Sequence, residues 1–101
     1  MKPTEKFNIQ KELKEVQSVK TFYDLEFVSN PSMKRARMTF DNEYGISVMK
    51  GIGTYGYKQN LWEVAVFHKG SICYNTHITD DVLGYQTESD VTNVMKLIQE
   101  L

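Results

Sequence analysis

The sequence of 101 residues has one cysteine, two prolines and no long run of hydrophobic residues. A single cysteine cannot form a disulfide within the chain, and it suits a reducing compartment. No apolar run approaches the roughly 20 residues needed to cross a bilayer, which excludes a membrane-spanning helix. The N-terminal stretch MKPTEKFNIQKELKE lacks the apolar region of a secretion signal. We therefore predict a cytoplasmic protein without a membrane partner.

An excess of one charge is missing as well. The chain carries 12 basic and 13 acidic side chains, for a net charge of -1, which disfavours a general binder of nucleic acids or membrane surfaces. It does contain 41% hydrophobic and 12% aromatic residues, too many for a disordered chain. A chain of this length builds one hydrophobic core, so we predict a single domain over residues 1–101.

Helical spacing of apolar residues appears at both ends of the chain. Residues 5–17 carry it near the N-terminus, so residues 1–20 are expected to form a loosely docked helix. Near the C-terminus, Thr87 and Asp90 match the signature of a helix start, and an apolar stripe follows over residues 91–101. That stripe must be buried, and a sheet is the expected partner.

Alternation of apolar and polar residues predicts five strands between these helices. They span residues 21–29, 35–40, 46–49, 61–67 and 72–74. Turn-rich segments join them as hairpins. The order of elements predicts an α+β fold, in which a mainly antiparallel sheet of four to five strands carries the N-terminal and C-terminal helices on one face.

The loop over residues 51–60 contains Gly51-x-Gly53-x-x-Gly56, which matches the dinucleotide-binding pattern by letter. That pattern requires a helix directly after the loop, whereas a strand is predicted here. In a kinase glycine-rich loop the following strand carries a lysine, and Phe67 takes that position here. We therefore expect no nucleotide cofactor, and interpret the segment as an exposed loop or a protein-binding loop.

Metal and nucleophile chemistry have equally little support. A hard cation usually needs three or more protein oxygens, and Asp80 and Asp81 have no further acidic cluster near them in the sequence. Roles in a turn or a helix cap therefore fit these two residues better. His68 and His77 have no zinc-ligand spacing. Cys73 is expected to be a small buried hydrophobe, since no histidine is placed to activate it. The sequence predicts no metal, no cofactor and no enzymatic activity.

Exposed aromatic residues instead favour protein binding, because tyrosine offers a large contact area at low entropic cost. We predict that an aromatic and acidic patch enters the basic nucleic-acid channel of a partner. Its candidate residues are Tyr55, Tyr57, Lys58 and Asn60 in the loop, and Asp80, Asp81 and Tyr85 as a second surface. The alternative is a nucleic-acid contact through Lys34, Arg35, Arg37 and Lys50. Charges that protect a strand edge from aggregation would also explain that cluster.

The segments FDNEYGISVM, GTYG, LWEVAV, ICYNT, ITDDV and GY follow one another from Phe40 to the C-terminal helix. Over residues 39–101 this pattern resembles a family of short, mostly uncharacterised bacteriophage proteins, with Glu43 where the family usually has glycine. The resemblance implies action in the cytoplasm of a bacterial host, with no catalytic residues to carry over.

By analogy, the resemblance implies a small non-enzymatic protein that binds and inhibits a bacterial host protein, such as a CRISPR effector or another defence nuclease. Two alternatives remain open. One is a phage protein that binds nucleic acid, and the other is a virion or assembly component that acts by self-association as a homo-oligomer.

Overall fold

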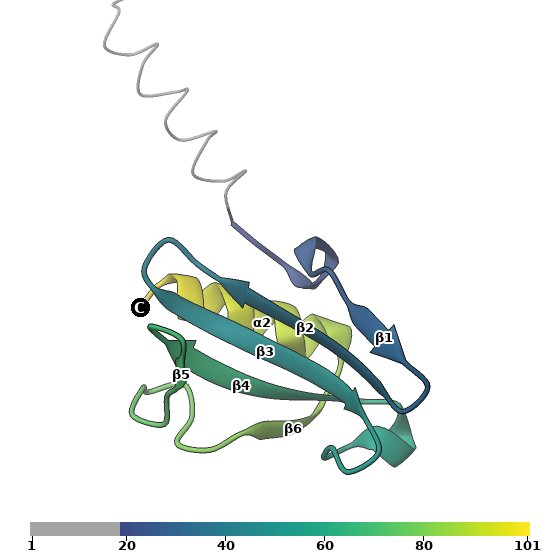
Figure 1. Ribbon diagram of the computed structural model, residues 1–101. Helices are drawn as coiled ribbons and strands as arrows, with labels where there is room; N and C mark the ends of the chain where they lie inside the picture. Colours follow the sequence, from purple (N-terminus) through teal and green to yellow (C-terminus); the bar gives the residue numbers. More distant parts are fainter. Residues whose placement is uncertain (1–18) are drawn as a thin grey trace, which may run out of the picture.

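The computed structural model describes residues 19–101, so the N-terminal helix predicted within residues 1–20 lies almost wholly outside the described residues (Figure 1). The elements are η1 (Phe22–Asp24), β1 (Val28–Asn30), β2 (Met33–Thr39), β3 (Tyr44–Gly51), η2 (Tyr57–Gln59), β4 (Trp62–His68), β5 (Ser71–Ile72), β6 (Leu83–Gln86) and α2 (Glu88–Gln99). Here η marks a short 3-10 helix. The predicted α+β class, antiparallel sheet and C-terminal helix are confirmed.

The sheet has six strands, and every pairing is antiparallel. Five strands follow the order β1-β2-β3-β4-β5, and β6 lies off this path. Strands β5 and β6 both pair with β4, with β5 opposite Phe67 and His68, and β6 opposite Trp62 and Val64. The prediction of four to five strands is therefore short by at least one. The four residues of β6 are too few to show an alternating pattern, and Gly84 interrupts them.

The strand predicted over residues 21–29 is wrong except at its end, where Val28 and Ser29 belong to β1. Residues 22–24 form η1, whose first turn is closed because the Asp24 carboxylate accepts a hydrogen bond of 2.8 Å from the Thr21 backbone N–H. Phe22 is buried, and its ring lies 5.5 Å from that of Trp62. A strand would place Tyr23 and Leu25 on the same face, whereas Tyr23 is exposed and Leu25 is buried.

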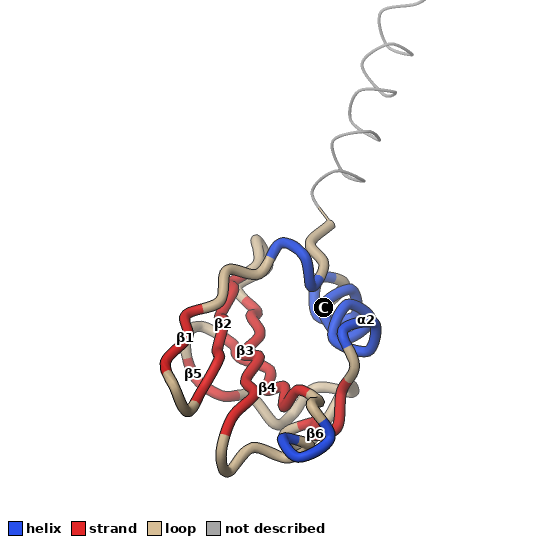
Figure 2. Tube along the Cα trace, turned by 90° about the vertical axis from the view of Figure 1, so that its right-hand side faces the viewer, coloured by secondary structure: helices blue, strands red, loops and turns tan. Residues whose placement is uncertain are grey.

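Helix α2 begins where the capping signature predicts. The Asp90 backbone N–H donates to the Thr87 hydroxyl at 3.1 Å, and the Asp90 carboxylate accepts from the Thr87 backbone N–H at 2.9 Å. Its apolar stripe is buried, and α2 lies along one side of the sheet (Figure 2). The core between the two layers contains Ile46, Val48, Val64, Val66, Val91, Val94, Met95 and Ile98.

The strand register assigns each residue to one face of the sheet. Ala36, Val48 and Val64 form one row across β2, β3 and β4, on the face that α2 covers. Because side chains alternate along a strand, Arg37 and its neighbour Ser47 point to the opposite face. Within residues 19–101, no helix lies on that opposite face (Figure 2).

Candidate functional site

The loop between β3 and β4 is a series of hydrogen-bonded turns. The Thr54 N–H donates to the Gly51 carbonyl at 3.0 Å, and the N–H groups of Gln59 and Leu61 both donate to the Gly56 carbonyl at 3.0 Å. Gly56 has φ of 95°, a left-handed conformation that glycine adopts without a steric penalty. The loop backbone is thus held in one shape, which fixes the direction of the side chains it carries.

Strand β6 brings Tyr85 against this loop. The Tyr85 N–H donates to the Tyr55 carbonyl at 3.3 Å. The two backbones pack so closely that a Cβ on Gly56 would lie 2.9 Å from the Tyr85 Cα, and a Cβ on Gly84 would collide with the Tyr55 Cβ. The glycines therefore permit a contact between segments that lie about thirty residues apart in the sequence.

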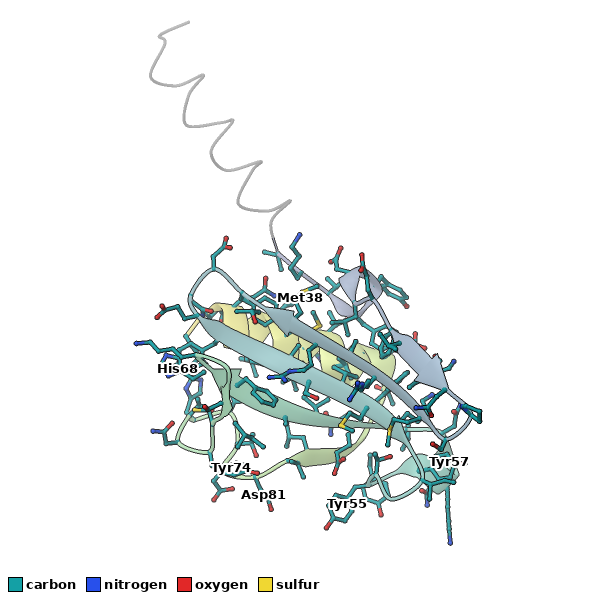
Figure 3. The ribbon with its side chains drawn as sticks, in the orientation of Figure 1. Met38, Tyr55, Tyr57, His68, Tyr74 and Asp81 are labelled. Atoms are coloured by element: carbon teal, nitrogen blue, oxygen red, sulfur yellow. The ribbon has the colours of Figure 1, made fainter. Side chains whose placement is uncertain are left out.

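The result is a shallow cavity of about 300 Å³, here called the tyrosine hollow. Its tyrosines are Tyr55, Tyr57 and Tyr85, whose exposed fractions are 60%, 45% and 56%. The remaining lining residues are Gly53, Thr54, Gly56, Lys58 and Gln59. Tyr55 and Tyr57 project from the same end of the molecule, far from His68 at the other end (Figure 3).

A second cavity, of about 210 Å³, adjoins the first because Tyr57 lines both. This lysine hollow is lined by Asn30, Pro31, Ser32, Met33, Lys34, Lys50, Gly51, Tyr57 and Asn60. Lys34 and Lys50 are direct cross-strand partners on β2 and β3. The Lys50 ammonium donates to the Asn60 side-chain oxygen at 2.9 Å and lies 4.1 Å from the centroid of the Trp62 ring.

The surroundings of Lys50 shift the pKa of its ammonium group. Partial burial lowers its pKa, the positive charge of Lys34 lowers it further, and Glu88 acts in the opposite direction. The like charge and the burial together outweigh the acidic neighbour. The lysine hollow therefore has a local excess of positive charge.

The residues predicted to bind a partner do not all lie on one surface: five line the two hollows, and two line neither. Tyr55, Tyr57, Lys58 and Tyr85 line the tyrosine hollow, and Asn60 lines the lysine hollow. Asp80 and Asp81 line neither hollow, and Asp81 lies along the edge between Tyr55 and Tyr74 (Figure 3). Its carboxylate accepts a 2.7 Å hydrogen bond from the Val82 N–H, as in a turn. The tyrosines thus have lysines beside them, where the sequence suggested aspartates.

The four basic residues proposed for nucleic-acid contact do not share one surface. Lys34 and Lys50 are on the helix side of the sheet, whereas Arg35 and Arg37 alternate with them and face the other side. The Arg37 guanidinium lies 4.0 Å from the centroid of the Phe67 ring. The sheet therefore splits the four residues of this predicted cluster into two pairs on opposite faces.

The histidine and cysteine side chains considered for chemistry pack against neighbouring residues of the fold. His68 stacks on Tyr44, with ring centroids 4.2 Å apart. Cys73 is buried as predicted, and its thiol donates to the Asn75 side-chain oxygen at 2.9 Å. Within residues 19–101, no group of three or more His, Cys, Asp or Glu side chains is arranged to hold a metal ion.

In the described part of the chain, no helix has the length and apolar character needed to cross a membrane. The chain matches no protein-family model, no curated protein and no solved structure. Function must therefore be inferred from the side chains that the two hollows bring together. Of these, the sequence suggested the tyrosines and grouped Lys34 with Lys50, but it did not indicate that Tyr57 lies beside the two lysines.

Proposed function

We propose that this protein is a small non-enzymatic binding protein that docks on a bacterial host protein through its tyrosine hollow and inhibits it. The observation that supports the proposal is the gathering of Tyr55, Tyr57 and Tyr85 on a hydrogen-bonded backbone. A tyrosine has few rotatable bonds, so it loses little entropy when a partner covers it. A backbone that is already fixed reduces the remaining cost of binding.

The shape of the hollow favours a protein surface over a small molecule as the ligand. Small-molecule sites enclose most of their ligand in cavities of roughly 300–1,000 Å³. At about 300 Å³ the tyrosine hollow is at the lower limit, and its three tyrosines are about half exposed. Exposed aromatic rings around a shallow depression are typical of the anchor residues of a protein interface.

The inhibitory role rests on the resemblance to short bacteriophage proteins that the sequence segments over residues 39–101 predict. A protein that works only by binding changes its partner's activity by occupying a surface or by holding one conformation. For a phage protein acting in a bacterial host, a CRISPR effector or another defence nuclease is the partner class that we propose.

Capture of host proteins tests the docking surface. Tagged protein is incubated with nuclease-treated bacterial lysate, using the wild type, the double variant Tyr55→Ala/Tyr85→Ala, and Tyr23→Ala as a matched control. Tyr23 is 82% exposed and lies outside both hollows. We expect the wild type and the control to capture one stoichiometric partner. The double variant should capture at least about tenfold less of it.

Phage plating tests the inhibitory role. Cells that carry an active defence system and express the wild-type chain should plate a restricted phage more efficiently than cells that express the double tyrosine variant.

In the capture experiment, equal capture by all three proteins would contradict the proposed surface. Recovery of nucleic acid alone would favour the nucleic-acid alternative, and recovery of the same chain alone would favour self-association.

A further inference from the structure

The lysine hollow contains a charge arrangement that does not stabilise the fold. Lys34 and Lys50 stand directly opposite each other on neighbouring strands, and like charges in this position are destabilising. Among residues 19–101, the single ion pair is Lys69 with Glu43, which joins the turn after β4 to the turn before β3. Neither lysine of the hollow therefore has a carboxylate within ion-pair distance, and Glu88 offsets the repulsion at Lys50 only in part.

The ammonium of Lys50 is nevertheless held in place. Asn60 accepts its hydrogen bond at 2.9 Å, and the Trp62 ring lies beneath it at 4.1 Å. An ammonium has three donors, so two remain for a ligand after the bond to Asn60. Tyr57 also lines the hollow and brings a hydroxyl group. The held charge of Lys50 and the neighbouring charge of Lys34 both line a cavity of about 210 Å³, which makes it a site for an anion.

We propose that the lysine hollow binds carboxylate groups from an acidic segment of the protein partner, next to the part of the partner that covers the tyrosine hollow. This inference rests on the proposed function, and it names the chemistry of the partner. Tyr57 lines both hollows, so one continuous segment can occupy them together. The complementary charge is then negative, opposite to the basic channel that the sequence suggested.

A nucleic-acid strand fits this site less well than an acidic protein segment. Strong binding of a nucleic acid requires several basic residues along a common track. Here Arg35 and Arg37 lie on the other face of the sheet and cannot extend the pair formed by Lys34 and Lys50. The net charge of -1 provides no general attraction for a polyanion. A local pair of lysines matches a local cluster of carboxylates.

The test is a titration with a hexaglutamate peptide and, separately, with a short oligothymidine of equal charge, followed by NMR of the backbone amides. The proteins are the wild type, Lys34→Gln/Lys50→Gln, and Lys20→Gln/Lys96→Gln, which removes the same charge elsewhere. Thermal unfolding checks that each variant is folded. We expect hexaglutamate to shift the amides of Lys34, Lys50, Tyr57 and Asn60. We also expect the first variant, but not the second, to lose about tenfold or more in affinity.

Three results would overturn the inference: no binding of hexaglutamate to the wild type, equal losses in both lysine variants, or tighter binding of oligothymidine through the same lysines. Its failure can be distinguished from failure of the proposed function. If the double tyrosine variant loses the host partner while Lys34→Gln/Lys50→Gln captures it normally, the docking surface stands and the carboxylate subsite does not. If the double tyrosine variant captures the partner normally, the proposed function itself is wrong.

Discussion

Gly56 shows how one residue without a side chain shapes the tyrosine hollow. Its φ of 95° is left-handed, and any Cβ at this position would lie 2.9 Å from the Tyr85 Cα and 3.1 Å from the Leu61 Cβ. Gly53 has nearly the same φ, 93°, but no atom lies within 4 Å of its ideal Cβ position. A comparison of alanine substitutions at these two positions therefore distinguishes the cost of backbone strain from the cost of steric overlap.

We predict that Gly53→Ala lowers the free energy of unfolding by about 1 kcal/mol, the cost of the left-handed backbone alone. Gly56→Ala should lower it by roughly 2–4 kcal/mol, because overlap with the backbone of β6 is added to that cost. Urea denaturation of both variants provides the comparison. Equal losses would show that the packing of the loop against Tyr85 contributes nothing to stability.

At the scale of elements, the start of α2 is held by the reciprocal bonds between Thr87 and Asp90. The backbone N–H of Thr87, and then its side chain, stabilise the ionised carboxylate and lower the pKa of Asp90 below its ordinary value of 3.8. A carboxyl group whose pKa is lowered by folding stabilises the folded state above its unfolded pKa. That contribution is lost as the pH falls through the folded pKa.

Asp90→Asn is therefore expected to lower thermal stability at neutral pH, because it removes the negative charge at the helix start. The difference in melting temperature between the variant and the wild type should disappear as the pH falls below the lowered pKa of Asp90. Thermal unfolding followed by circular dichroism from pH 7 downward measures this. A difference that stays constant across the acid range would rule out a contribution from the ionised carboxylate.

The buried stripe of α2 is the main link between the two layers. Met95 is fully buried, whereas Leu97, on the outer side of the same helix, is 42% exposed. We predict that Met95→Ala lowers the free energy of unfolding by about 2–5 kcal/mol, since it removes apolar contacts and leaves a cavity. Leu97→Ala should cost less than about 1 kcal/mol. Similar losses in urea denaturation would contradict the assigned helix face.

Elements were predictable to the extent that their signals are local. The hairpin of β2 and β3, the buried strand β4 and the cap of α2 are each encoded within a few residues, and all three appear in the structure. The strand expected over residues 21–29 is wrong over residues 21–27, because burial of Phe22 against Trp62 outweighs the alternating pattern. Strand β6 was missed because it depends on pairing with β4.

At the scale of the whole molecule, the sheet separates two pairs of basic residues that we expected to form one nucleic-acid contact. Arg35→Gln/Arg37→Gln removes the pair on the face without a helix, and Lys34→Gln/Lys50→Gln removes the pair in the lysine hollow. We predict that the arginine variant keeps hexaglutamate affinity within about twofold of the wild type, because screened charges on the far face contribute little. Titration under the same salt conditions as the lysine variant tests this, and a comparable loss would show that both pairs act on one ligand.

The sequence by itself determined the fold class, the main hairpin and the C-terminal helix, because alternation, helical spacing and capping act between residues close in the chain. Only the tertiary structure decided the composition of the two hollows. Tyr85 joins Tyr55 because β6 pairs with β4, and Lys34 meets Lys50 because burial of Ala36 and Val48 fixes the register of β2 on β3. A shift of that register by one residue would turn every side chain of β2 to the other face. The long-range burial that selects the register is thus what creates the candidate site.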